Sequence, residues 1–167
     1  MLEFFSPSWT HPREWQVRAL AIATAHFSQP IPESVVIQAI MGAGKSLLLC
    51  ELAATVKLRD GEVIVVSTST EGLVQELYKD LRNRCGQYRT VGTWYGKRKR
   101  MAQVVVVCVP SMQSFADAMR ASGKTCALWI ADEVHRSEAP TVLAAEKSLT
   151  PAHSLGLTAT AFRSDEK

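Results

Sequence analysis

The sequence lacks the features that would place the chain in a membrane or on a secretory route. No apolar run approaches the roughly 18 residues needed to cross a bilayer. The longest β-branched run, residues 104–109, has the length of a buried strand. The first residues have neither the basic region nor the long apolar segment of a secretory signal. We therefore expect no membrane partner.

Closely spaced cysteines and histidines are also missing. The four cysteines form no C-x-x-C pair, the four histidines are scattered, and three of the cysteines lie within apolar segments. This spacing favours structural thiols in a reducing cytosol over a zinc site or disulfide bonds. The cysteines are Cys50, Cys85, Cys108 and Cys126.

The bulk composition is that of one ordinary globular domain. The chain has 167 residues, of which 47% are hydrophobic and 21% charged, so a packed core is expected and disorder is not. A formal net charge of +3 permits nucleic acid as a partner but does not require it. No internal repeat, low-complexity segment or linker divides the sequence.

Apolar runs alternate with helical patterns along nearly the whole chain. Continuous rather than alternating hydrophobicity in the strands, with helices between them, predicts an α/β fold whose parallel sheet is covered on both faces. The expected helices are residues 10–27, residues 45–58, a segment with Leu73, Leu77 and Leu81 spaced four apart, and a segment capped by Ser111 with Phe115 and Met119 inward. The expected strands are residues 35–41, 63–67, 89–94, 104–109, 126–131 and 154–157.

A glycine-containing loop follows the first of these strands and opens a helix. It matches the phosphate-binding pattern G-x-x-x-x-G-K-S, with Ala39 in place of the first glycine. Gly42 and Gly44 let the backbone turn its N–H groups toward a phosphate, Lys45 reaches the β- and γ-oxygens, and Ser46 offers a hydroxyl to Mg²⁺. The alternative is a glycine-rich turn with a surface lysine. The predicted loop comprises Met41, Gly42, Ala43, Gly44, Lys45, Ser46 and Leu47.

Paired carboxylates follow the apolar strand at residues 126–131. Asp132 and Glu133 would lie at a carboxyl end of the sheet, where open α/β sheets bind ligands. Asp132 would hold Mg²⁺, and Glu133 would polarise the water that attacks the γ-phosphate. The alternative is a solvated acidic loop. We expect this pair to face the glycine loop across adjoining strand ends, a few ångströms away, which predicts a nucleoside triphosphate hydrolase.

Four motifs occur in a fixed order. They are Arg13-x-x-Gln16, the glycine loop, Asp132-Glu-Val-His135 and Thr158-Ala-Thr160. Together they resemble the first motor domain of superfamily 2 DExH helicases and translocases, and among these the UvsW-, RecG- and RadD-like DNA repair and recombination members. The resemblance spans about residues 12–163. It implies a three-layer α/β/α RecA-like P-loop NTPase domain with a mainly parallel central sheet, using ATP and Mg²⁺.

The resemblance also assigns roles to single residues. It implies that Gln16, with Arg13, binds the adenine, that His135 links the nucleotide to neighbouring motifs, and that Thr158 and Thr160 couple the ATP state to strand movement. The family usually has proline where this chain has Ala161. An exposed polar residue remains the alternative for Gln16, and a structural histidine for His135.

Three segments are candidates for nucleic-acid contact. Two of them loosely resemble family segments that grip a nucleic-acid backbone, and simple helix capping is the alternative for the first. The third is the one concentrated basic cluster, behind Trp94 and Tyr95, which could bind phosphates, stack a base or simply be solvated. The candidate residues are Ser69, Thr70, Ser111, Gln113, Lys97 and Arg98.

The resemblance implies the N-terminal motor domain of an ATP-dependent DNA helicase or translocase, in the cytoplasm or associated with the nucleoid. Such motors use a second RecA-like domain that supplies arginine fingers. The chain ends just after the Thr158 motif, so we expect a full-length protein to carry that domain and this chain alone to be nearly inactive. A restriction or CRISPR-associated motor, an RNA helicase and a non-catalytic nucleotide- or nucleic-acid-binding module remain alternatives.

Overall fold

A seven-stranded sheet forms the centre of the computed structural model, which describes residues 1–30, 34–40, 42–132 and 140–159. The strand order is β2-β9-β8-β4-β7-β5-β6, and every neighbouring pair is parallel except the last. The strands are β2 (Ser34–Gln38), β4 (Glu62–Thr68), β5 (Val91–Tyr95), β6 (Arg98–Lys99), β7 (Val104–Cys108), β8 (Thr125–Asp132) and β9 (His153–Thr158). The two-residue strands β1 (Glu3–Phe4) and β3 (Val56–Lys57) pair separately.

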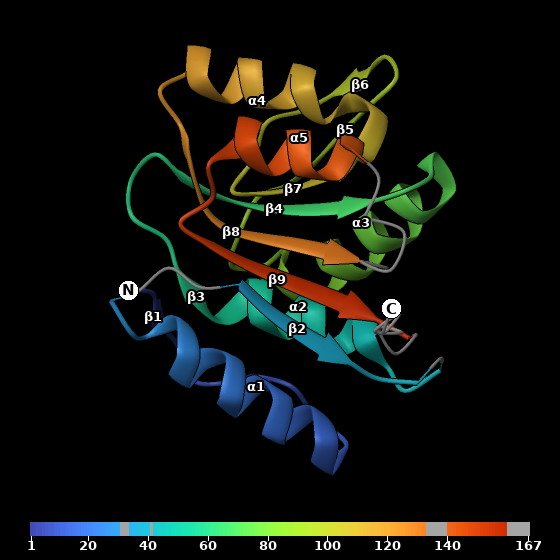
Figure 1. Ribbon diagram of the computed structural model, residues 1–167. Helices are drawn as coiled ribbons and strands as arrows, with labels where there is room; N and C mark the ends of the chain where they lie inside the picture. The colour runs from blue at the N-terminus through green and yellow to red at the C-terminus, as the bar shows by residue number, and fades with distance from the viewer. Residues whose placement is uncertain (31–33, 41, 133–139, 160–167) are drawn as a thin grey trace, which may run out of the picture.

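Helices cover both faces of this sheet, as Figure 1 shows. One face carries α1 (Glu14–Phe27), α2 (Lys45–Thr55) and α3 (Glu71–Cys85). The other carries α4 (Met112–Ala121), which follows the short 3-10 helix η1 (Val109–Ser111), and α5 (Pro140–Leu149). The predicted three-layer α/β/α architecture with a mainly parallel sheet is therefore confirmed.

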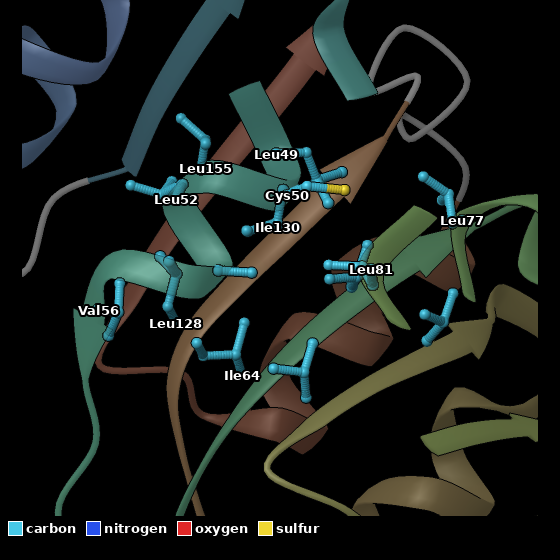
Figure 2. Close-up of a cluster of buried hydrophobic side chains, with 14 of the residues drawn as sticks. Leu49, Cys50, Leu52, Val56, Ile64, Leu77, Leu81, Leu128, Ile130 and Leu155 are labelled. Atoms are coloured by element: carbon cyan, nitrogen blue, oxygen red, sulfur yellow. The ribbon is translucent and has the colours of Figure 1, made fainter. Parts of the chain in front are cut away.

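The core lies on both sides of the central strands. In β4, Ile64 packs toward α2 and α3, whereas Val65 packs toward α4, because successive strand residues point to opposite faces. Figure 2 shows the first of these clusters, in which leucines of α2 and α3 meet Ile64, Leu128 and Ile130 of the sheet. A strand buried on both faces needs apolar residues at every position, which explains the unbroken hydrophobic runs.

Several element boundaries differ from those expected. β2 ends at Gln38 and is an edge strand with Val36 48% exposed, so it is not buried as predicted. α1 begins at Glu14, not at residue 10. α2 ends at Thr55 because the chain then becomes extended to pair with β1, and the guanidinium of Arg89 donates to the carbonyls of Ala54 and Val56 at this end.

Local sequence patterns missed four short elements. β1 and β3 have only two residues each and depend on each other for hydrogen bonds. The segment predicted as a basic loop contains β6, which pairs with β5. The helix α5 was not expected because its apolar residues do not form a clear run.

All four cysteines are buried and free, as predicted for structural thiols. Burial raises the pKa of Cys85 to about 11 and that of Cys126 to about 12, so both remain protonated at neutral pH. Across the described part of the chain, no three metal-binding side chains cluster. None of the helices within the described ranges is both long and apolar enough to cross a membrane.

Candidate nucleotide-binding site

The glycine loop joins β2 to α2 and turns through two left-handed residues. Gly42 has φ +75° and Gly44 has φ +91°, a region that residues with a Cβ rarely adopt. Gly44 is the N-cap of α2, so the N–H groups of the first turn lack partners within the helix and are available to an anion. The Lys45 ammonium turns back over the loop and donates to the Ala39 carbonyl at 3.2 Å, while Ser46 is exposed.

Two side chains from the start of α1 donate hydrogen bonds to backbone carbonyls of the glycine loop. Arg13 Nη1 donates to the carbonyls of Ala43 at 3.0 Å and Gly42 at 3.3 Å. Gln16 is 1% exposed, and its Nε2 donates to the Gly44 carbonyl at 3.0 Å. Its Oε1 accepts the Arg13 N–H at 2.7 Å and so caps α1. The predicted adenine-binding pair therefore contacts the phosphate loop, and adenine binding stays a prediction.

Asp132 and the glycine loop lie at the same edge of the sheet, but not on adjoining strands. Because β2, β9 and β8 are parallel, their carboxyl ends meet at one edge, with β9 between the other two. The expectation of adjoining strands is therefore wrong. Two interstrand spacings put the backbones of β2 and β8 roughly 10 Å apart. Order along the chain does not fix order in a parallel sheet, because each crossover can skip a neighbouring position.

Thr158 lies on the intervening strand β9, at the point where the glycine loop leaves β2. Thr158 lies opposite Gln38 in the β2–β9 register, and its carbonyl accepts the Ala39 N–H at 2.9 Å. One residue earlier, Leu157 lies opposite Asp132 in β8. Thr158 is fully buried. Its strand β9 pairs with β2 on one side and with β8 on the other, so the backbone of β9 connects the start of the loop to the Asp132 strand. Predicted site residues outside the described ranges are Met41, Glu133, His135 and Thr160.

The donor set at this edge fits a triphosphate with Mg²⁺. Helix N–H groups and the Lys45 ammonium suit phosphate oxygens, while the Ser46 hydroxyl and the half-buried Asp132 carboxylate are hard oxygen ligands. Among the described residues, no atom outside the neighbouring positions lies within 4 Å of the place where a Cβ of Gly42 would be, so the loop is uncovered at this point. The two halves come from distant parts of the sequence and meet through the sheet.

The nucleic-acid candidates share this edge, on its other half. Ser69 and Thr70 join β4 to α3, and Thr70 caps α3 by accepting the Leu73 N–H at 3.4 Å. The Ser69 hydroxyl is buried without a hydrogen-bond partner among the described residues. Helix capping is thus real for Thr70, while Ser69 keeps an unused donor.

The other two candidate segments are the start of α4, with Ser111 and Gln113, and the exposed β5–β6 hairpin, with Lys97 and Arg98. The Gln113 amide donates to Asp117 at 3.1 Å and accepts from Ser148 at 2.7 Å, which commits it to internal bonds. Ser111 occupies the N-cap position of α4 without a side-chain hydrogen bond, so the expected capping does not occur. Lys97 and Arg98 are exposed on the β5–β6 turn. Both rings behind them are buried, Trp94 at 8% and Tyr95 at 5% exposure, so neither offers a face for base stacking.

Sequence reasoning missed one residue that supports the site. Glu51 in α2 is 2% exposed, and its carboxylate accepts the Ser8 N–H at 2.5 Å. This contact ties the segment before α1 to the helix that starts at the glycine loop. The signal was present, because Glu51 is the one charged residue in the apolar stretch between Leu47 and Val56.

Comparisons with solved structures show the same fold in an ATPase core, a restriction-modification enzyme and a hypothetical RNA helicase. The SWI2/SNF2 ATPase core of Sulfolobus solfataricus, solved with double-stranded DNA, matches with a TM-score of 0.72 and 12% identity over 96% of this chain and 36% of that one. A nuclease-deletion mutant of the type ISP restriction-modification enzyme LlaGI, solved with a DNA substrate mimic, matches with a TM-score of 0.68 and 16% identity. That match covers 94% of this chain and 19% of the LlaGI chain. A hypothetical ATP-dependent RNA helicase from Sulfolobus tokodaii matches with a TM-score of 0.68 and 17% identity, over 92% of this chain and 47% of the helicase chain.

The chain spans less than half the length of each of these solved chains. No curated protein matches it. The model of one protein family, described as type III restriction enzyme, res subunit, matches residues 10–163, which include the whole glycine loop and the Asp132 strand. The chain therefore belongs to the type III restriction enzyme res subunit family, and its fold is that of a RecA-like helicase domain.

Proposed function

We propose that this chain is the ATP-binding and ATP-hydrolysing N-terminal motor domain of an ATP-dependent DNA helicase or translocase. One observation supports this most directly. The glycine loop and Asp132 share one carboxyl edge, and Thr158 lies on the strand between them. That arrangement brings a phosphate cradle and a metal-binding carboxylate into one site.

Each residue of this site has a defined task in the proposal. Lys45 holds the β- and γ-phosphate oxygens, and Ser46 with Asp132 holds Mg²⁺. Bound Mg²⁺ would neutralise the charge that develops on the phosphates. Glu133 takes the proton of the attacking water, and His135 connects the site to its neighbours.

Arg13 and Gln16, which contact the glycine loop, and Thr158 on the neighbouring strand also have roles in the proposal. Arg13 and Gln16 fix the loop. Beyond these contacts the Gln16 amide keeps one N–H and one oxygen lone pair, with which it binds the adenine beside Arg13. Thr158 and Thr160 transmit the nucleotide state. Because Thr158 accepts the N–H of Ala39, a shift of the loop on hydrolysis would move β9 directly.

We propose DNA as the nucleic-acid substrate, and a cytoplasmic or nucleoid-associated location. A second RecA-like domain in the full-length protein would be the partner of this one. Two of the similar structures were solved with DNA or a DNA mimic. The motif order supports a repair or recombination enzyme of the UvsW, RecG or RadD kind. The family description and the LlaGI similarity favour a second candidate, the motor of a restriction system. An appended nuclease or guide-binding domain would distinguish it.

The chain alone should bind ATP weakly and hydrolyse it very slowly. Arginine fingers from a second RecA-like domain contribute on the order of 10³ or more to the rate, and the residues proposed above for this site include no arginine finger. The test is ATP binding by calorimetry and phosphate release with and without DNA, with Lys45→Ala as the control for contaminating ATPase. Absence of ATP binding, or a turnover above about 1 per second abolished by Lys45→Ala, would contradict the proposal.

A further inference from the structure

The strands β5 and β6 form a hairpin that presents three of the four consecutive cations of residues 97–100 at the carboxyl edge of the sheet. Lys97 forms the tip, and Arg98 and Lys99 form β6, which pairs with Tyr95 and Trp94. All three cations are exposed. We refer to Lys97, Arg98 and Lys99 as the hairpin cations. The ATP site described above does not use them.

The hairpin cations are divided between the two faces of the sheet. Arg98 lies over the Tyr95 ring at 5.9 Å and donates to its hydroxyl at 3.1 Å. Tyr95 belongs to the core cluster on the α3 side. Lys99 lies over the Trp94 ring at 5.7 Å, and Trp94 belongs to the cluster on the α4 side. Buried rings thus hold the positive charges in place and reduce the entropy lost when they bind an anion.

The hairpin is hydrogen-bonded to the start of α4 and lies close to the start of α3, next to the other two nucleic-acid candidate segments. Trp94 Nε1 donates to the Ser114 hydroxyl at 3.0 Å, which in turn donates to the Ser111 carbonyl at 2.9 Å. On the other side the Glu71 carboxylate, in the first turn of α3, lies next to Gly96 at the hairpin turn. The start of α3, the start of α4 and the hairpin cations therefore lie next to one another and form one strip of the surface.

We propose that the hairpin cations bind the phosphodiester backbone of a nucleic-acid strand that runs along this strip. This inference rests on the proposed function for the presence of nucleic acid, but it assigns the contact to a hairpin outside the four motifs. Arg98 uses one of its five N–H donors on Tyr95, so the others can reach phosphate oxygens. The alternative is that lysines and arginine on the edge strand β6 only prevent edge-to-edge association.

The test compares the salt dependence of binding to fluorescein-labelled oligothymidylate for the wild type and for a Lys97→Ala/Arg98→Ala/Lys99→Ala variant. Each phosphate contact on a single strand adds about 0.7 to the slope of log K against log salt, so the slope should fall by about 2. At low salt the affinity should fall at least tenfold. The control, Arg18→Ala/Lys79→Ala/Lys124→Ala, removes the same charge at other places on the surface and should leave the slope unchanged.

A gain-of-binding variant excludes loss of folding as the explanation. Glu71→Gln removes the negative charge next to the hairpin turn and should tighten oligothymidylate binding severalfold. Equal slopes for wild type and the hairpin variant, with or without new self-association, would overturn the inference and leave the ATP proposal intact. Absence of oligothymidylate binding by a wild type that binds ATP would also overturn it, whereas absence of ATP binding bears on the proposed function alone.

Discussion

Replacing Lys45 by alanine is expected to weaken ATP binding roughly 10- to 100-fold while leaving the fold intact. A hydrogen bond to a charged group contributes about 1.5–3 kcal/mol, which corresponds to that range of affinity. Lys45 donates a partly buried hydrogen bond to the Ala39 carbonyl, so its loss should change the free energy of unfolding by at most about 1 kcal/mol. Isothermal titration with ATP and a denaturant titration measure the two effects.

The matched control for this prediction is Lys79→Ala, which removes an exposed lysine from the middle of α3. It should change neither ATP affinity nor stability. If Lys45→Ala bound ATP as tightly as the wild type, the loop would be a glycine-rich turn with a surface lysine. A non-catalytic nucleic-acid-binding module would then become the better account of the chain.

Substituting alanine for Gly44 is expected to destabilise the protein by about 2–5 kcal/mol and to abolish nucleotide binding. The left-handed backbone at φ +91° costs a residue with a Cβ roughly 1–2 kcal/mol. The new Cβ would also lie 2.8 Å from Nε2 of the buried Gln16. Moving that amide aside would break its hydrogen bonds to the Gly44 carbonyl and the Arg13 N–H, at a cost of about 1–3 kcal/mol. Chemical denaturation monitored by tryptophan fluorescence measures the stability.

Gly123→Ala separates the backbone effect from the collision. Gly123 has φ +66° and no atom within 4 Å of its would-be Cβ, and it precedes β8 at the edge opposite the glycine loop. It should lose only about 1–2 kcal/mol and keep nucleotide binding. In a Gln16→Ala background, Gly44→Ala should cost about 1–3 kcal/mol less than in the wild type, because the overlap with Gln16 is gone. Equal losses for the two glycine variants would mean that Gln16 does not press against the loop.

The sequence was sufficient to predict the fold class and the local form of the loop. Both follow from short-range information, since unbroken apolar runs such as β7 require burial on both faces, and glycines at Gly42 and Gly44 permit the left-handed turn. The grouping of Ser46 and Asp132 at one edge also followed from strand direction. Their assigned chemistry is a prediction that the fold permits but does not test.

What the sequence could not give is the information carried by tertiary contacts. The position of β9 between β2 and β8 depends on how the crossovers pack, and nothing in the strand itself states its neighbours. The same is true of Gln16, whose amide contacts the Gly44 carbonyl 28 residues away. The bond from Trp94 to Ser114 likewise joins two segments that gave no joint signal, although it fixes the hairpin to the start of α4.

The central claim is that the glycine loop and Asp132 act on one bound nucleotide across the width of β9. Nuclear magnetic resonance of the labelled chain with Mn²⁺ and ATP tests this directly, because the paramagnetic ion broadens only nearby amide signals. The amides of Ser46, Asp132 and Thr158 should broaden together, while that of Lys124 at the opposite edge should stay sharp. Broadening at Ser46 that spares Asp132, or that centres on Lys124, would contradict the claim.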